Sequence, residues 1–139
     1  MKVIKFILPI FLVFFSTTQV SAQIYRFKAD SYSVMEKKAN GKWGNWTDFN
    51  NTPVLISIDG KKNRIIINSK EIQLYTILSF GEKIVDNTKE ILPIECADNS
   101  GGLCRILIVT KKNEENRKQF YINYDDIKIV YNVFDMCEV

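Results

Sequence analysis

Few side chains in this 139-residue sequence are suited to chemistry: it has three cysteines and no histidine. Without an imidazole, neither a serine nor a cysteine nucleophile can be activated by the usual histidine base, and zinc sites that use histidine are excluded. A zinc site made of cysteine alone needs four thiolates, one more than the chain holds. We therefore expect no catalytic residue, no metal ligand and no cofactor, and a protein that is not an enzyme.

Carboxylates could still act in pairs, and Asp125-Asp126 is the adjacent acid pair that stands beside apolar strand patterns. Such a pair can bind Ca²⁺ or share a proton. A turn explains it better, because aspartate between two strands bonds its own backbone. The run Asp98–Gly102 (DNSGG) lacks the alternating acids of an EF-hand loop and is interpreted as a hairpin turn. A hydrolase that uses carboxylates alone would need two of them about 5–10 Å apart in a cleft, and no pattern places them so.

Cys96 and Cys104 flank that turn. A hairpin symmetric about the middle of DNSGG sets the two cysteines directly opposite each other, with Cα atoms about 4.5–5.5 Å apart, within the range of a disulfide. The same register sets Glu95 opposite Arg105, a favourable cross-strand pair. We expect a Cys96–Cys104 disulfide with Cys137 unpaired. The alternative is that all three are buried free thiols.

Trp43 and Trp46 concentrate aromatic surface after the Asn40-Gly41 dipeptide, a strong hairpin signal. Exposed aromatic side chains bind sugars or protein partners. In a strand the odd separation of the two tryptophans would point them to opposite faces, one toward the core and the other toward solvent. Core packing is the simpler interpretation, and an exposed aromatic contact through Trp43 or Trp46 is the functional one.

The first 22 residues have the features of a cleavable secretory signal peptide. Met1–Lys5 holds two lysines, Phe6–Phe15 is an unbroken apolar run, and Ser16–Ala22 ends in Val-Ser-Ala. A retained anchor would need about 20 apolar residues, twice the length of this run. We expect cleavage before Gln23, no stable membrane anchor, and export to the periplasm or the medium, in a chain whose Lys, Asn and Ile usage looks bacterial.

Charge gives no argument for nucleic acid as a partner. The chain holds 19 Lys and Arg against 16 Asp and Glu, and loss of Lys2 and Lys5 with the signal leaves 17 basic residues. Two short basic groups, Lys61–Arg64 and Lys111–Lys118, are interpreted as solvated hairpin tips. A nucleic-acid interface would instead need a clustered basic face.

Short runs rich in Ile, Val, Tyr and Phe recur every eight to twelve residues between polar turn clusters, which is typical of an antiparallel all-β domain. In the last run, the period of two predicts that Ile127, Ile129, Tyr131 and Val133 face inward. The predicted strands are Ile24–Ala29, Tyr32–Lys38, Trp43–Phe49, Val54–Ile58, Arg64–Asn68, Ile72–Leu78, Lys83–Val85, Glu90–Cys96, Leu103–Thr110, Gln119–Tyr124 and Ile127–Val133.

Short connections predict an antiparallel meander of about 8–10 strands that closes into a small barrel or forms a strongly curved sheet or sandwich. The domain would span residues 23–139 and is similar to the lipocalins in architecture only, which implies no function. We expect a non-enzymatic binding protein for a small apolar ligand or an extracytoplasmic protein partner. The alternatives are an inhibitor or protective factor for an extracytoplasmic enzyme, and a carboxylate-only hydrolase.

Overall fold

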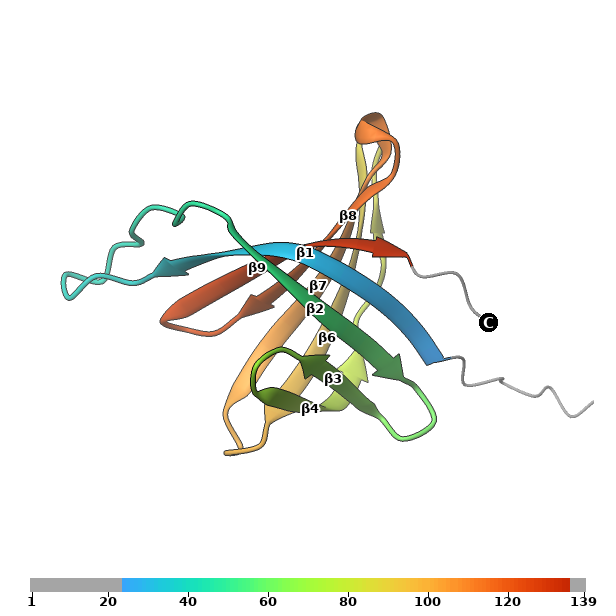
Figure 1. The fold of residues 1–139 in the computed structure, drawn as a ribbon, viewed down its shortest axis with the longest axis horizontal. Coiled ribbons are helices and arrows are strands. Elements are labelled where there is room, and N and C mark those ends of the chain that lie inside the picture. The colour runs from blue at the N-terminus through green and yellow to red at the C-terminus, as the bar shows by residue number, and fades with distance from the viewer. Residues whose placement is uncertain (1–23, 136–139) are drawn as a thin grey trace, which may run out of the picture.

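The computed structural model describes residues 24–135, so the predicted signal peptide, its cleavage site and Cys137 lie outside the described residues. Strands make up most of this range, and a 3-10 turn, η1 (Lys112–Glu114), joins two of them (Figure 1). The strands are β1 (Ile24–Glu36), β2 (Asn50–Asp59), β3 (Arg64–Asn68), β4 (Ile72–Phe80), β5 (Ile84–Val85), β6 (Lys89–Asp98), β7 (Leu103–Lys111), β8 (Arg117–Asn123) and β9 (Ile127–Asp135).

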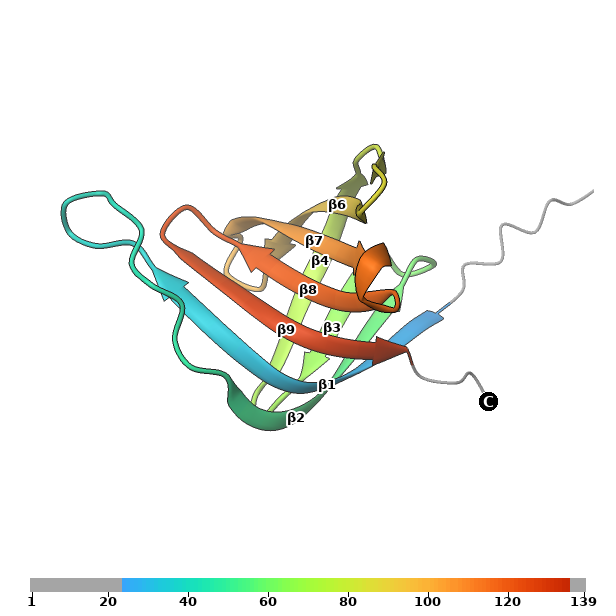
Figure 2. The ribbon, with the colours of Figure 1, turned by 90° about the horizontal axis from the view of Figure 1, so that it is seen from above.

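The strands form one antiparallel sheet in the order β4-β3-β2-β1-β9-β8-β7-β6-β5, and a further pairing of β4 with β6 closes it (Figure 2). The result is a closed eight-stranded barrel with β5 as an extra strand, which confirms the predicted all-β fold. Most neighbours in the sheet are neighbours in the sequence, as short turns require. The β4–β6 and β1–β9 pairs are the long-range contacts that turn a curved sheet into a barrel.

Alternation along the strands fills the barrel with branched apolar side chains. On β9, Tyr131 and Val133 are buried in the core and Ile129 packs against it, as predicted. The fully enclosed layer of the core consists of Ala29, Ile56, Ile65, Ile67, Ile94, Ile106, Phe120 and Ile122.

The first two predicted strands are one continuous strand, β1, with an irregularity between Ala29 and Ser31. Ala29 pairs with Val133 and Ser31 pairs with Asn132, so β1 advances two residues where β9 advances one. This extra residue in β1 is a β-bulge. Asp30 and Ser31, the two residues between the predicted strands, are of polar types that often occur in turns. The bulge keeps the strand paired and changes which residues face the core. As a result, Tyr32 packs against the core beyond it.

The prediction of a strand over Trp43–Phe49 is wrong: apart from a single bridge between Lys37 and Trp43, this segment is not a strand. The segment runs beside β1 but uses three residues where β1 uses two. The N–H of Gly44 donates to Glu36 O and the N–H of Thr47 to Val34 O, so the two segments do not keep the one-to-one register of a ladder. We name residues 37–49 the strap. Its tip extends beyond the end of the barrel (teal in Figures 1 and 2).

The predicted turns are confirmed. Gly41 has a φ of 81°, which glycine adopts readily, and its N–H donates to Lys38 O at the tip of the strap. Gly101 has the same φ in the β6–β7 turn, where the N–H of Asp98 donates to Gly102 O. Asp125 and Asp126 form the β8–β9 turn, closed by the N–H of Tyr124 donating to Ile127 O.

Candidate functional site

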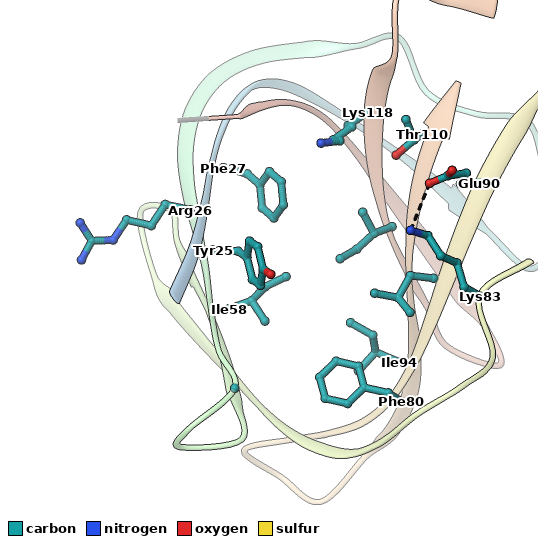
Figure 3. Close-up of a pocket in the computed structure, with 13 residues that line it drawn as sticks. Tyr25, Arg26, Phe27, Ile58, Phe80, Lys83, Glu90, Ile94, Thr110 and Lys118 are labelled. Carbon is teal, nitrogen blue, oxygen red and sulfur yellow. Dashed lines mark ion pairs between the residues drawn. The ribbon is translucent and has the colours of Figure 1, made fainter. Parts of the chain in front are cut away.

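The interior of the barrel is hollow at one end, which we name the mouth. Here the described residues enclose a cavity of about 540 Å³ (Figure 3). Its apolar lining comes from β1, β2, β4, β6 and β7, and its ionisable side chains stand nearer the rim. The lining residues are Tyr25, Arg26, Phe27, Ile58, Gly60, Phe80, Lys83, Glu90, Leu92, Ile94, Ile108, Thr110 and Lys118.

Register explains the layering of this cavity on β6, β7 and β8. Glu90 lies opposite Thr110, and Thr110 lies opposite Lys118, so three polar side chains form one row across adjacent strands. The next inward row, two residues deeper on each strand, is Leu92, Ile108 and Phe120. The cavity therefore has a polar rim and an apolar wall directly beneath it.

The opening arises where β6 changes its partner. The deeper half of β6 pairs with β4, ending at Phe80 opposite Ile94. Beyond that pair, β6 pairs instead with the short strand β5, through Ile84–Ile91 and Val85–Glu90. Gly81 marks the point where the strands part: its N–H donates to Pro93 O, and a Cβ there would lie 2.7 Å from the Pro93 ring. Only glycine permits this approach, and the chain then diverges and leaves the mouth open.

Glu90 is shared by two lysines. Its Oε2 lies 3.2 Å from Lys83 Nζ, and its Oε1 lies 3.8 Å from Lys112 Nζ. Lys83 turns inward to this carboxylate, whereas Arg26 points away from the cavity (Figure 3). The carboxylate is thus outnumbered by the cations around it.

The opposite end of the barrel, which we name the closed end, is filled by tyrosines and thiols. Tyr75 and Tyr131 are buried, and Tyr32 and Tyr124 pack against the core. The Tyr124 hydroxyl donates to Asp98 Oδ2 at 2.8 Å, and this hydrogen bond is the main reason why the pKa of the Asp98 carboxyl is lowered. Burial raises the pKa of Tyr75 to about 12.

Cys96 and Cys104 lie opposite each other at this closed end, as predicted, and the expected Glu95–Arg105 pair forms an ion pair at 2.6 Å. Both cysteines are nevertheless buried free thiols, so the structure does not contain the expected disulfide. Burial raises the pKa of Cys96 to about 12 and that of Cys104 to about 11.

The type of strand pair explains why opposition is not enough for a bond. The hydrogen bond from Asp98 N–H to Gly102 O closes the turn. Hydrogen-bonded and non-hydrogen-bonded residue pairs alternate along an antiparallel hairpin. Cys96–Cys104 lies two residues from the hydrogen-bonded pair Asp98–Gly102, so it is a hydrogen-bonded pair too. In such pairs the Cβ atoms are near the wide end of about 4.5–5.5 Å, whereas a disulfide needs about 3.5–4.5 Å.

Trp43 and Trp46 both lie in the strap and neither belongs to the buried core. Lys37 and Lys128 place their ammonium groups 5.4 and 4.5 Å from the centre of the Trp43 ring. Trp46 is 39% exposed and meets Tyr121 of β8 edge to face, with ring centroids 6.3 Å apart. The two tryptophans therefore pack on the outside of the barrel rather than on opposite faces of a strand.

Beneath the strap, the outer face of β1, β9 and β8 carries a chain of polar contacts. Asn132 Nδ2 donates to Ser31 Oγ, Gln119 Nε2 donates to Asn132 Oδ1, and the Tyr121 hydroxyl donates to Gln119 Oε1. Ser33 Oγ bonds the Thr47 carbonyl of the strap at 2.6 Å. The Ser33 bond attaches the strap to the barrel wall, and the other three satisfy polar groups of the wall beneath it.

Within residues 24–135 no three His, Cys, Asp or Glu side chains are grouped as a metal site would require. In the same range no helix is long and apolar enough to cross a membrane. Asp125 and Asp126 stay in their turn, on the end of the barrel opposite the cavity.

Sequence reasoning predicted a small apolar ligand but named no residue of the cavity or of its rim. The inward alternation of Glu90, Leu92 and Ile94 is visible in the sequence, and so is that of Lys118 and Phe120. Their meeting in one row depends on the pairing of three strands.

Comparison of the chain with models of protein families, with curated proteins and with solved structures finds no match.

Proposed function

We propose that the protein is a non-enzymatic binding protein that holds a small, largely apolar ligand in the mouth cavity. The observation that carries the proposal is the cavity itself: about 540 Å³, with walls formed by Phe27, Ile58, Ile94, Leu92 and Ile108. Ligand sites in proteins are typically concave, mostly apolar and about 300–1,000 Å³ in volume. An eight-stranded barrel is wide enough to be filled by side chains or to hold one small ligand.

The alternatives have less support. A carboxylate-only hydrolase would need two facing carboxylates, and Glu90 is the one acid among the described residues that line the cavity. An inhibitor that acts through its surface would not need a hollow interior. Binding inside the barrel gives the cavity a use, and export to the envelope or medium, where such a carrier would meet its ligand, remains part of this proposal.

A cavity-filling substitution tests this function. Leu92→Trp should place an indole in the cavity and weaken the binding of an apolar probe such as dodecanol by at least about tenfold, because the ligand and the indole compete for one space. Leu103→Trp is the matched control, since Leu103 is exposed at the closed end. Isothermal titration calorimetry gives the affinities, and thermal melting shows that each variant is folded. No binding of dodecanol by the unaltered protein, or equal binding by both variants, would refute the proposal.

A further inference from the structure

The rim of the mouth cavity carries an excess of positive charge. Among the described residues that line the cavity, the cations are Arg26, Lys83 and Lys118, and the acid is Glu90. Arg26 points away from the cavity (Figure 3), but Lys112 adds its ammonium group on the far oxygen of Glu90. Lys83 and Lys112 thus share this one carboxylate, so the described ion pairs of the rim leave an excess of positive charge.

The neighbouring β7–β8 tip does not cancel this excess. Lys111 and Arg117 bridge Glu114 at 3.6 Å and 3.3 Å, and Glu115 follows it, so the tip adds two cations and two acids. The basic group Lys111–Lys118 of the sequence therefore stands beside the opening of the cavity. An anion that approaches this end meets a favourable potential, which a cleft with low-dielectric walls focuses.

The floor of the cavity, unlike the rim, suits an apolar group and not a charged one. Phe27, Ile58 and Ile94 are almost fully buried and offer no hydrogen-bond partner through their side chains. A charged group moved to that depth would lose its hydration without compensation. Thr110, between Glu90 and Lys118 in the polar row, places a hydroxyl at the boundary between the two zones.

We propose that the ligand is a single-chain amphiphile with one negative charge, whose apolar chain fills the cavity and whose anionic head lies at the rim beside Lys118, Thr110 and Lys83. This inference rests on the proposed function and adds the charge and the orientation of the occupant. The chain enters first, because the wall is apolar from Leu92 inward. The head remains partly hydrated and is attracted by the lysines of the rim.

The test compares three probes of equal chain length: dodecanoate, dodecanol and dodecyltrimethylammonium. Calorimetry is done below the concentrations at which they form micelles and at a mildly alkaline pH, where the carboxylate is ionised. We expect dodecanoate to bind at least about tenfold more tightly than the cation, and this preference to shrink as salt is added. Equal binding of anion and cation, with dodecanol bound normally, would overturn the inference and leave the proposed function standing. Failure of all three probes to bind would refute both.

Variants of the rim make the test specific. Lys118→Gln should weaken dodecanoate by about two- to fivefold, the range of a partly exposed ion pair, and leave dodecanol unchanged. Glu90→Gln should change dodecanoate affinity by a similar factor in the opposite direction, because it removes the competing negative charge. Lys28→Gln is the matched control, since Lys28 of β1 is exposed and does not line the cavity. A loss in Lys118→Gln that is the same for dodecanol, or the same in Lys28→Gln, would contradict a charged head at the rim.

Discussion

The two ends of the barrel are built from the same strands and differ in how their last rows are filled. At the closed end, tyrosines and thiols occupy the interior, and the Tyr124 hydroxyl is bonded to Asp98. At the mouth the corresponding rows end in Glu90, Thr110 and Lys118, which surround open volume. Large aromatic side chains fill a barrel of this width, whereas extended charged side chains at the rim leave space behind them.

The pairing partner of β6 also differs between the two ends. The β4–β6 pairing runs from Tyr75–Asp98 at the closed end to Phe80–Ile94 and stops there, and β5 takes over the free edge of β6. The strap adds a second layer outside β1, β9 and β8. The contrast is between a closed end that is packed throughout and a mouth that is hollow, and the proposed function assigns that hollow to a ligand.

Truncation along β7 gives the largest expected difference between the ends. Ile106→Ala should lower the free energy of unfolding by about 3 kcal/mol, because Ile106 is fully buried between Ile94 and Ile122 and its loss leaves a cavity. Ile108→Ala, two residues nearer the mouth, should cost only about 1 kcal/mol, because its side chain already borders open volume. Urea unfolding measures both, and equal losses would mean that the mouth is packed like the rest of the core.

Thiol chemistry compares the two ends in a second way. Cys104 and Cys96 should react with iodoacetamide on the order of a hundredfold more slowly in the folded than in the unfolded protein. Their pKa values near 11 and 12 keep them protonated at neutral pH, and the thiolate is the nucleophile. The rate in the folded protein should therefore keep rising with pH toward these values, whereas the rate of an ordinary thiol levels off above about pH 8.5.

Thr110→Cys supplies the matched thiol at the mouth, on the same strand as Cys104, and should react at a rate close to that of a free thiol. Mass spectrometry of the labelled peptides locates the modified residues. Rapid labelling of Cys104 in the folded protein would contradict a dry closed end. A linked Cys96–Cys104 peptide would show instead that the strand register is sufficient for a disulfide after all.

The strap provides the smallest of these effects. Trp46→Ala should lower the free energy of unfolding by about 1 kcal/mol, because it removes the edge-to-face contact with Tyr121. Val130, which lies between Ser33 and Tyr121 in the sheet, should become more exposed. Leu78→Ala, at an exposed position on β4, should leave stability unchanged within about 0.5 kcal/mol. If Trp46→Ala is equally silent, the strap does not stabilise the barrel.

Much of the local structure follows from neighbouring residues and could be predicted from the sequence. Strand β3 has the predicted bounds, Arg64–Asn68, and the DNSGG turn sets Cys96 opposite Cys104 because a hairpin register depends only on the turn it contains. The strap was mispredicted because composition does not show how a segment pairs. Trp43–Phe49 has the aromatic composition of a strand, but its hydrogen bonds to β1 do not follow the register of a ladder.

By itself, the sequence determined the all-β class, most of the strands and the inward face of β9, because alternation and turn residues act over a few positions. Only the tertiary structure decided that β4 pairs with β6, that the two tryptophans lie outside the barrel, and that the two opposed cysteines are free thiols. It also decided the cavity. Glu90, Thr110 and Lys118 are distant in the chain and become neighbours through two strand pairings. The empty volume behind them exists because eight strands close around it, so no single segment of the sequence predicts it.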